Sequence, residues 1–383
     1  MKIVFVSNYM NVHQEPLCKE FIKAIGYDNF HFVACNSFDR ARAISGYVDM
    51  NDKPFVVKAH SDIVRARQLV RDADIAIIMP YSNLDFLRYR LSSTDGLTFA
   101  YSERLLKLGQ IYKYNPLKYY RVYSEFTKYR GYDNFQVLCA SAFTSNDLVS
   151  FGFPADKCWK WGYFPNTPVS FPKKSSVAPL SLAWVGRLIN WKRPQMALHL
   201  AHELAKSGFD FEMQMIGDGP LRKEVDSFVA SEQLQDIVLV RGAVSNTEVQ
   251  STLSKSHIFI STSTRREGWG AVINEAMGNG CAPVAADQIG AVPYLIKHNY
   301  NGYIYHHNDF NEMLKLVQKL INNQSNLNSF GQRSFEHIAS LWNARSAVKA
   351  LLQLSNKLTS GVGSYLDEGP CSKAECIQDK WFH

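Results

Sequence analysis

This sequence of 383 residues lacks any long hydrophobic run, and other absences narrow its class further. No apolar stretch reaches the roughly 18 residues of a membrane-spanning helix, and the apolar start, residues 1–7, stops too early for a secretory signal. The seven cysteines include no pair with Cys-x-x-Cys spacing, so we expect reduced thiols rather than a zinc or redox centre. The net charge of +7 is not gathered in one dense run, which argues against a nucleic-acid-binding arm.

The composition is that of a globular protein with two cores. Hydrophobic residues make up 46% and charged residues 20% of the chain, and the length predicts two domains at roughly 100–200 residues each. Strand-like and helix-like segments alternate from the start, which predicts an α/β fold with a parallel sheet and helices on both faces. The strands expected in the first half are residues 2–7, 30–34, 55–58, 75–79 and 97–101.

The loop after the first expected strand, residues 8–15, is polar and contains no glycine. Ligands of parallel α/β sheets bind beyond the carboxyl ends of the strands, which makes this loop a candidate binding segment. Contact would come through the side chains of Asn11, His13 or Gln14 rather than through the backbone. His13 could equally be a loop histidine bonded to its own backbone.

The second half opens with an apolar run, residues 180–185, that ends in Gly186 and Arg187. Lys192 follows five residues after Arg187, and Pro194 marks the start of a helix. Arginine offers a planar fork of N–H donors to phosphate oxygens, and lysine adds a point charge. The spacing therefore predicts a diphosphate-binding site, although two surface cations at a helix start remain the alternative.

Two further loops that follow expected strands contain glycine. The first comes after the run 211–216, where glycines permit a tight turn above the strand end. The second comes after the run 237–240 and leads into a capping box at residues 245–248. The residues of interest in the two loops are Gly217, Asp218, Gly219, Arg241, Gly242 and Val244.

The stretch 265–277 reads as a loop leading into a helix that begins near Gly270. The first N–H groups of a helix have no internal partner and carry partial positive charge, so they suit phosphate. A loop carboxylate such as Glu267 can accept hydrogen bonds from sugar hydroxyls, and Glu275, about one turn into the helix, from a ribose diol. The expected contact residues here are Glu267, Gly268, Trp269, Gly270, Ala271, Val272 and Glu275.

Glu267 and Glu275 stand in the sequence Glu-Gly-Trp-Gly-Ala-Val-Ile-Asn-Glu-Ala-Met, with seven residues between them. This resembles the signature of family 4 glycosyltransferases, including bacterial surface-polysaccharide enzymes. The Gly-Arg-Leu…Lys element at 186–192, the Gly-Asp-Gly-Pro turn at 217–220 and the segment 241–244 are similar to the family's other motifs. The resemblance implies the GT-B fold, in which two Rossmann-like doubly wound domains face each other across a cleft.

The resemblance also implies roles for individual residues. Arg187 and Lys192 neutralise the diphosphate leaving group of a nucleotide sugar, together with the helix after Gly270. Glu267 holds the donor sugar and Glu275 the ribose, while the backbone of residues 241–244 contacts the base. No metal and no cofactor are expected, because arginine, lysine and helix N–H groups supply the positive charge.

The N-terminal half departs from the family pattern at the position nearest the chemistry. Many relatives have a histidine after the strand that corresponds to residues 97–101, whereas this chain has Glu103 in that region. Glu103 or His13 is therefore the expected catalytic side chain of this half. The expected acceptor-side residues are Asn11, His13, Gln14 and Glu103.

Residues 104–132 interleave seven basic residues with seven tyrosines and contain a single acidic residue, Glu125. Tyrosine and lysine both suit a membrane–water interface, since each has an apolar body and a polar tip. The same mixture would suit single-stranded nucleic acid, or a solvated helical pair whose tyrosines pack on the domain. The composition alone leaves these three interpretations open.

The expected organisation is an acceptor-binding domain at 1–165, a linker at 166–179 rich in proline, serine and lysine, and a nucleotide-sugar-binding domain at 180–343. Residues 344–383 are expected to return to the first domain.

We expect a retaining glycosyltransferase that uses a UDP-sugar, or else a GDP-sugar. Its acceptor would be a lipid-linked saccharide of polysaccharide or lipopolysaccharide biosynthesis, reached from the cytoplasm at the inner face of the cell membrane; a soluble acceptor is the rival. A GT-B epimerase or phosphorylase and a non-catalytic nucleotide-sugar-binding subunit are the alternative functions. No nucleic-acid partner is expected.

Overall fold

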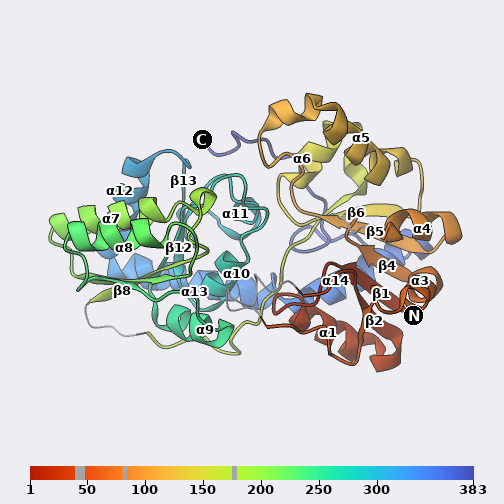
Figure 1. Cartoon of the computed structure of the whole chain (residues 1–383), viewed down its shortest axis with the longest axis horizontal. Coiled ribbons are helices and arrows are strands. Elements are labelled where there is room, and N and C mark those ends of the chain that lie inside the picture. The colour runs from red at the N-terminus through yellow and green to blue at the C-terminus, as the bar shows by residue number, and fades with distance from the viewer. Residues whose placement is uncertain (39–47, 81–83, 175–178) are drawn as a thin grey trace. The chain divides into compact units, whose positions relative to one another are not determined.

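The structure is a computed structural model that describes residues 1–38, 48–80, 84–174 and 179–383 (Figure 1). It divides into two compact units. Unit 1 contains residues 1–38, Val48–Pro165 and Leu341–Trp381, and unit 2 contains the described residues of Asn166–Ser340 together with Phe382–His383. The expected linker thus falls in unit 2 as far as it is described, and its residues 175–178 lie outside the described residues.

Unit 1 is built on a seven-stranded parallel sheet with the order β3-β2-β1-β4-β5-β6-β7. The interior strand β1 is buried along its whole length, as its unbroken apolar sequence predicts. Ile3 of β1 pairs with Phe30 of β2 on one side and with Ile75 of β4 on the other. The strands are β1 (Ile3–Ser7), β2 (Phe30–Ala34), β3 (Val56–Lys58), β4 (Ile75–Ile78), β5 (Leu97–Ser102), β6 (Phe135–Cys139) and β7 (Cys158–Lys160).

Helices cover this sheet, and the late helix α14 packs against α1 near the start of the chain. The α-helices are α1 (Glu15–Ile25), α3 (Ile63–Asp72), α4 (Phe86–Ser93), α5 (Pro116–Glu125), α6 (Thr144–Val149) and α14 (Ala344–Ser360). The 3₁₀ turns are η1 (Tyr27–Asn29), η2 (Gln110–Tyr114), η3 (Thr127–Tyr129) and η4 (Ala155–Lys157).

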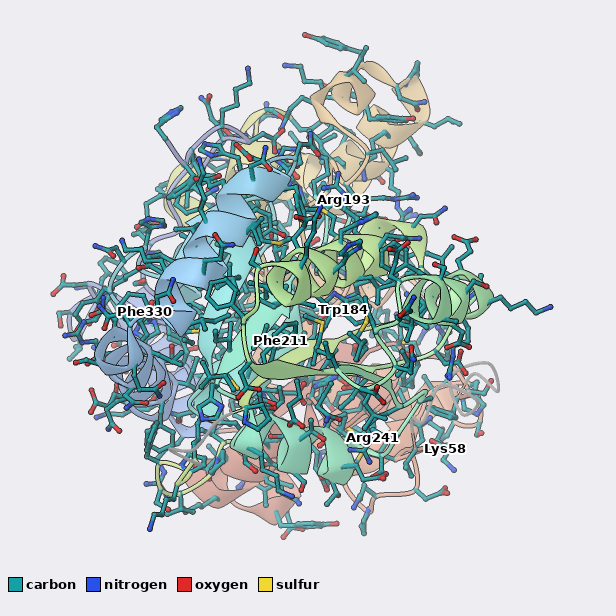
Figure 2. All side chains as sticks on the ribbon, turned by 90° about the vertical axis from the view of Figure 1, so that its left-hand side faces the viewer. Lys58, Trp184, Arg193, Phe211, Arg241 and Phe330 are labelled. Carbon is teal, nitrogen blue, oxygen red and sulfur yellow. The ribbon has the colours of Figure 1, made fainter. Side chains whose placement is uncertain are left out.

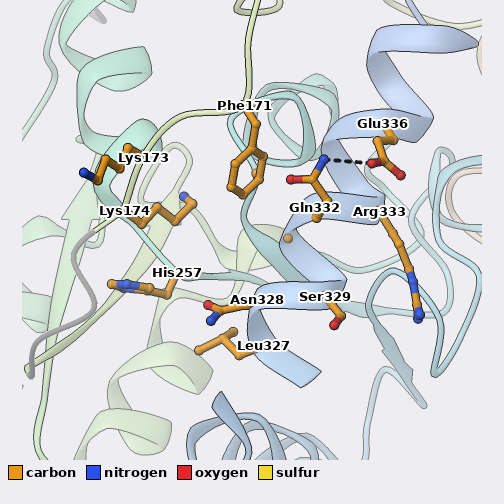
Figure 3. A pocket seen from close by; sticks show the side chains of 12 residues that line it. Phe171, Lys173, Lys174, His257, Leu327, Asn328, Ser329, Gln332, Arg333 and Glu336 are labelled. Atoms are coloured by element: carbon orange, nitrogen blue, oxygen red, sulfur yellow. Dashed lines mark hydrogen bonds between the residues drawn. The ribbon is translucent and has the colours of Figure 1, made fainter. Parts of the chain in front are cut away.

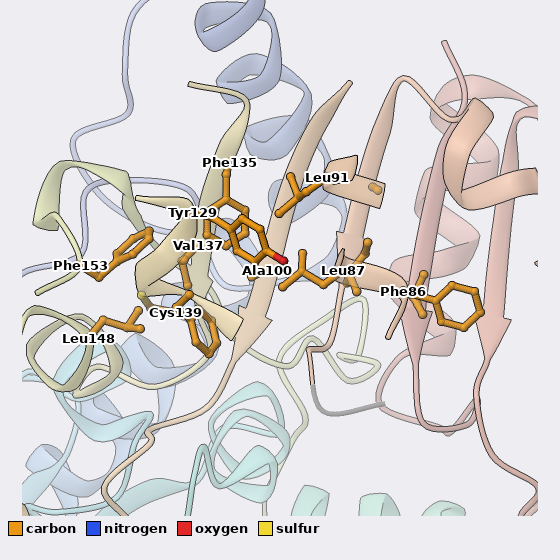
Figure 4. Close-up of a cluster of buried hydrophobic side chains, with 14 of the residues drawn as sticks. Phe86, Leu87, Leu91, Ala100, Tyr129, Phe135, Val137, Cys139, Leu148 and Phe153 are labelled. Carbon is orange, nitrogen blue, oxygen red and sulfur yellow. The ribbon is translucent and has the colours of Figure 1, made fainter. Parts of the chain in front are cut away.

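The core of unit 1 lies between the sheet and these helices (Figure 4). Phe86 and Leu87 of α4 belong to the same buried cluster as Ala100 of β5 and Phe135 of β6. Burying each large apolar side chain contributes about 1.5–3 kcal/mol, so the cluster accounts for much of this unit's stability.

Helix α4 was not expected from the sequence, because one of its buried positions is an arginine. Arg90 is fully buried and its Nη1 donates to the carbonyl oxygens of Val70 (2.7 Å), Arg71 (2.9 Å) and Ala73 (2.7 Å). These carbonyls end α3, where a helix has no further N–H donors of its own. Burial lowers the pKa of Arg90 to about 10, so the side chain stays charged at neutral pH.

Unit 2 has a six-stranded parallel sheet with the order β10-β9-β8-β11-β12-β13. Figure 2 marks Trp184 on β8, Phe211 on β9 and Phe330 on α13. The strands are β8 (Leu180–Val185), β9 (Phe211–Ile216), β10 (Val238–Val240), β11 (Ile258–Ser261), β12 (Ala282–Ala286) and β13 (Tyr303–Tyr305). The helices are η5 (Asn190–Lys192), α7 (Pro194–Lys206), α8 (Arg222–Ser231), α9 (Asn246–Lys255), α10 (Ala271–Gly278), α11 (Val292–Leu295), α12 (Phe310–Ile321) and α13 (Gln324–Ser340).

Both sheets confirm the expected α/β class with doubly wound, Rossmann-like topology. In each unit the first strand lies inside the sheet, and the chain builds outward in one direction before it crosses to the other side. The order reverses between β1 and β4 in unit 1 and between β8 and β11 in unit 2, and such reversal points are where doubly wound sheets bind ligands. None of the helices in the described part of the chain is long and apolar enough to cross a membrane.

Replacing Arg90 with methionine should destabilise unit 1 by about 3 kcal/mol or more. The carbonyls at the end of α3 would remain buried without their charged donor, and each such bond contributes roughly 1.5–3 kcal/mol. Thermal unfolding measures the effect, and Arg88→Met on the exposed side of the same helix is the control. Equal unfolding temperatures for the two variants would contradict this role of Arg90.

Candidate functional site

In unit 2, the loops that follow β8 and β11 meet at the reversal point of the sheet. Lys192 Nζ forms an ion pair with Glu267 Oε2, and the two side chains are only 15% and 17% exposed. The Thr264 N–H donates to the Trp191 carbonyl at 2.8 Å, and the Thr262 hydroxyl donates to the Lys192 carbonyl at 2.6 Å. A cation predicted to bind diphosphate and a carboxylate predicted to bind sugar are thus adjacent.

Arg187 lies beside this pair and is exposed to solvent. Its guanidinium carbon is 5.6 Å from the centre of the Trp191 ring, and that of Arg266 is 4.9 Å from the same ring. Contact with an aromatic face attracts a guanidinium and limits its rotamers without using its N–H donors. No sequence pattern singled out Trp191 or Arg266, and the only local signal was a tryptophan next to Lys192.

The glycines after β9 allow their turn to pack closely against the loop after β8. Gly217 and Gly219 have φ values of +138° and +157°, and a Cβ on Gly219 would lie 2.6 Å from the Leu188 carbonyl oxygen. A Cβ on Gly217 would overlap the Gly186 carbonyl. The Leu188 N–H donates to the Asp218 carbonyl at 2.9 Å. Glycine is therefore required at both positions to bring this turn against the Arg187 loop.

The segment after β10 joins the same group of loops. The Gly217 N–H donates to the Gly242 carbonyl at 2.8 Å, and the Arg241 N–H donates to the Met215 carbonyl at 2.9 Å. The Arg241 guanidinium is directed to α9, where Nη1 donates to the Thr252 hydroxyl at 3.4 Å. Val244 is partly buried and directly precedes the capping box of α9, which forms as the sequence predicts.

Gly270 begins α10 with φ +91°, and a Cβ there would lie 2.9 Å from Ile289 Cγ2. Ala271 and Val272 form the first turn of the helix and are partly exposed, as a phosphate-binding turn requires. Gly268 is buried within the same loop.

The side chain of Trp269, one of the expected contact residues, is buried. Its side chain is 1% exposed and its indole N–H donates to Asn274 Oδ1 at 2.7 Å, inside the domain. The indole therefore anchors the loop to the interior of the domain, and only the backbone of Trp269 remains for ligand contact.

Glu275 is buried, and its position on α10 is defined by two amides from α9. Its Oε1 accepts hydrogen bonds from Asn246 Nδ2 and Gln250 Nε2, each at 3.0 Å. Gln250 also accepts a hydrogen bond from Asn279 Nδ2 at 2.7 Å. The network holds the carboxylate in one orientation, and no sequence pattern had indicated Asn246 or Gln250.

Unit 1 has a cavity of about 310 Å³ at its own reversal point. Its lining comes from residues at and after the carboxyl ends of β1, β4 and β5, with Tyr163 from beyond β7. The lining includes three of the expected acceptor-side residues, Asn11, Gln14 and Glu103. The structure brings these three together, as the parallel sheet predicts.

Glu103 is held by two neighbours in this cavity. Tyr163 donates its hydroxyl to Glu103 Oε1 at 3.0 Å, and Lys107 Nζ contacts Glu103 Oε2 at 2.5 Å. Burial and the nearby Glu103 carboxylate raise the pKa of Tyr163 well above its usual value, and the same two causes raise the pKa of Tyr101. Both phenols therefore stay protonated at neutral pH.

The first loop is ordered by its own side chains. Gln14 Nε2 donates to the Ser7 hydroxyl at 3.0 Å, and Asn11 Nδ2 donates to Gln14 Oε1 at 3.0 Å. The backbone N–H of His13 donates to Asn11 Oδ1 at 3.0 Å. His13 is not among the residues that line the cavity, so Glu103 is the better placed of the two catalytic candidates of this unit.

A second cavity, of about 690 Å³, lies in unit 2 away from the loops described above (Figure 3). His257 in its lining precedes β11, so this cavity is at the amino ends of the strands. Lys174 donates to the carbonyls of Leu253 and Ser256 at the end of α9, and Gln332 donates to Glu336 at 2.7 Å. The two bonds of Lys174 connect the chain before β8 to α9. The cavity shares no lining residue with the loops after β8 and β11.

Within the described residues, no three His, Cys, Asp or Glu side chains are grouped so that they could hold a metal ion. No disulfide joins any of the seven cysteines, all of which lie in the described residues.

Residues 170–337 match the family model described as glycosyl transferases group 1. The chain is 32% identical over 144 residues to an uncharacterised glycosyltransferase of Methanocaldococcus jannaschii, which covers 37% of this chain and 40% of that one. It is 25% identical over 191 residues to the poly(ribitol-phosphate) alpha-N-acetylglucosaminyltransferase of Staphylococcus aureus strain COL. That match covers 50% of this chain and 37% of the relative. It is 24% identical over 229 residues to the amylovoran biosynthesis glycosyltransferase AmsK of Erwinia amylovora. That match covers 58% of this chain and 56% of the relative. The chain thus spans about two fifths to a little over half the length of these relatives.

Solved structures resemble nearly the whole chain. Anabaena Alr3699/HepE in complex with UDP has a TM-score of 0.69 at 15% identity and covers 94% of this chain and 100% of that one. The apo form of the lipopolysaccharide outer core galactosyltransferase WaaB has a TM-score of 0.65 at 14% identity, with 94% and 100% coverage. At these identities the likeness concerns the fold, which is that of GT-B proteins.

The ion pair between Lys192 and Glu267 should show strong energetic coupling. In a cycle of Lys192→Met, Glu267→Gln and the double variant, we expect a coupling of about 1–3 kcal/mol in unfolding free energy, because both charges are largely removed from water. The control cycle uses the surface pair of Arg222 and Asp226 on α8, for which about 0.5 kcal/mol or less is expected. Equal coupling in the two cycles would show that the loops after β8 and β11 do not depend on this pair.

Proposed function

We propose that this chain, whose residues 170–337 match glycosyl transferases group 1, is a retaining glycosyltransferase of polysaccharide or lipopolysaccharide biosynthesis. It transfers a sugar from a nucleoside diphosphate donor to an acceptor hydroxyl. The observation that carries this proposal is the group of Arg187, Lys192, Glu267 and the first turn of α10 at one reversal point of one sheet.

The diphosphate of the donor would lie against Arg187, Lys192 and the first turn of α10. As the bond to the sugar breaks, negative charge grows on the leaving diphosphate, and preorganised cations and N–H groups stabilise that charge. Because these groups supply positive charge, the proposed reaction uses no metal ion. Retention follows if the acceptor attacks from the face that the diphosphate leaves, with a leaving phosphate oxygen taking the acceptor proton.

Glu267 would accept hydrogen bonds from the donor sugar while it keeps its ion pair with Lys192. The pair therefore connects sugar recognition to diphosphate recognition in one rigid unit. Glu275, oriented by Asn246 and Gln250, would accept from the ribose. The backbone of residues 241–244 would contact the base.

A UDP-sugar is the preferred donor, with a GDP-sugar as the second choice. HepE, which resembles this chain over nearly its full length, was solved with UDP.

We propose that the acceptor binds in the cavity of unit 1 through its hydroxyl groups. Glu103 presents a carboxylate there, and the Tyr163 hydroxyl fixes its orientation. Relatives named for amylovoran biosynthesis and for poly(ribitol-phosphate), a polyol phosphate polymer, support an acceptor rich in hydroxyl groups. A lipid-linked saccharide at the inner face of the cell membrane is the preferred form, and a soluble acceptor is the alternative.

Two other functions share the fold. A GT-B epimerase or phosphorylase would show no transfer from a nucleotide sugar to a saccharide acceptor. A non-catalytic subunit would bind nucleotide sugar without hydrolysing it. Transfer is favoured because Glu267 lies directly beside Lys192, where donor sugar and diphosphate must be held together.

Replacing Arg187 with alanine should weaken UDP binding by about 10- to 150-fold. The variant loses a charge-assisted hydrogen bond of roughly 1.5–3 kcal/mol. A thermal-shift screen of nucleotide sugars first identifies the donor, and calorimetry then compares UDP affinity in Arg187→Ala with that in Arg65→Ala, an exposed arginine of α3. Unchanged affinity would remove Arg187 from the site, and absence of any nucleotide-sugar binding would refute the proposed function.

Replacing Glu103 with glutamine should raise the KM for the acceptor about tenfold or more and leave UDP affinity unchanged. The amide cannot accept the charge-assisted bond, and Glu103 belongs to the other unit from the donor site. Transfer kinetics at saturating donor measure the effect, with Glu20→Gln on α1 as the control. A change in UDP affinity without a change in acceptor KM would contradict the assignment.

A further inference from the structure

An exposed apolar surface is concentrated in residues 107–132, which include η2 and α5. Of the 19 large apolar or aromatic side chains exposed in the described residues, nine fall in this range. Ile111 and Leu117 are 74% and 82% exposed, and Leu108 is also exposed. The other six are tyrosines, among them Tyr114 and Tyr120. We call the exposed apolar and basic side chains of residues 107–132 the η2–α5 patch.

Packing within the chain does not explain this composition. Only Val122 of the ten residues of α5 is buried, and η2 has no buried residue. The segment is nevertheless well formed, since Asn115 Oδ1 accepts from the Lys118 N–H at 3.0 Å and Pro116 stands at the first helical position. A helix with one buried position is ordinarily polar on its other sides. Here those sides carry leucine and tyrosine.

The charge of the patch has one sign. Residues 107–132 contain six basic residues and a single acidic residue, Glu125, which pairs with Arg121 at 3.2 Å. Lys128 and Arg130 are exposed, and Lys113 is partly exposed. The next acidic residue along the chain is Asp133.

We propose that the η2–α5 patch docks this protein onto the surface of an anionic phospholipid bilayer. Tyrosine and leucine side chains enter the headgroup region of a bilayer, while lysine and arginine pair with anionic lipid headgroups. Single-stranded nucleic acid fits less well, because Leu108, Ile111 and Leu117 offer no ring on which a base can stack. A second copy of the chain fits less well too, since a two-fold interface would bring like charges together.

The patch adjoins the cavity of unit 1. Lys107 lines that cavity and is followed at once by Leu108, the first apolar residue of the patch. Docking would therefore bring the acceptor cavity close to the lipid surface. This deepens the proposed function, because a lipid-linked saccharide could then reach Glu103 without leaving the bilayer.

The test is sedimentation of the full chain with phosphatidylcholine vesicles, with and without phosphatidylglycerol. We expect binding that requires phosphatidylglycerol and weakens as salt is added. The apolar variant Ile111→Ser, Leu117→Ser, Tyr120→Ser should lose most of the binding. Its matched control, Tyr27→Ser, Val64→Ser, Val362→Ser, removes exposed apolar groups elsewhere on unit 1 and should bind like the unchanged protein.

The charge variant Lys113→Gln, Lys128→Gln, Arg130→Gln should weaken binding by about fivefold for each cation removed. Its control is Lys223→Gln, Lys315→Gln, Lys349→Gln, which removes three exposed lysines elsewhere. Equal vesicle binding by patch variants and controls overturns the proposal, as does no binding by the unchanged protein.

Two further measurements separate the alternatives. A dimer in light scattering that the apolar variant abolishes would indicate a protein interface instead, and oligonucleotide binding without vesicle binding would indicate nucleic acid. Donor hydrolysis without vesicles should be the same in all variants. If neither the unchanged protein nor any variant hydrolysed the donor, while vesicle binding was as expected, the proposed function would be refuted and the docking surface would still be supported.

Discussion

The ion pair between Lys192 and Glu267 is the contact on which the proposed donor site depends. It joins the loop after β8 to the loop after β11, at the one place where the order of the unit 2 sheet reverses. Because the two charges are mostly removed from water, loss of either one would leave the other largely buried without a compensating charge. Because both loops are also bonded through Thr262 and Thr264, the geometry of the site is set before any ligand arrives.

The remaining parts of the site follow from that junction. The turn at Gly217 and Gly219 packs so closely on the Arg187 loop that a side chain at either position would collide with backbone. Trp191 provides a surface for the Arg187 and Arg266 guanidinium groups, and the buried Trp269 holds the following loop from inside. Preorganisation of this kind allows cations and N–H groups to stabilise charge without first rearranging.

The two units share one topology but present different side chains where the strand order reverses. At this reversal the loops of unit 2 carry glycine and cations, while those of unit 1 carry polar side chains around a cavity. Glycine and cations suit a diphosphate, which backbone and charge can hold closely, whereas hydroxyl-rich acceptors call for directional side-chain partners. The η2–α5 patch adds a surface to unit 1 that the fold itself does not require.

The sequence by itself determined the alternation of strands and helices, the strands 180–185 and 211–216, and the order of the loops. These features depend on local periodicity and on glycine and capping residues. It also brought Asn11, Gln14 and Glu103 into consideration, since parallel strands place their carboxyl ends at one edge. Tertiary structure alone decided that Trp269 points inward, that Asn246 and Gln250 orient Glu275, that Arg266 meets Trp191, and that Arg90 is buried in a helix no pattern predicted. Those outcomes depend on contacts between segments far apart in the chain or on burial, which the spacing of residues along the sequence does not specify.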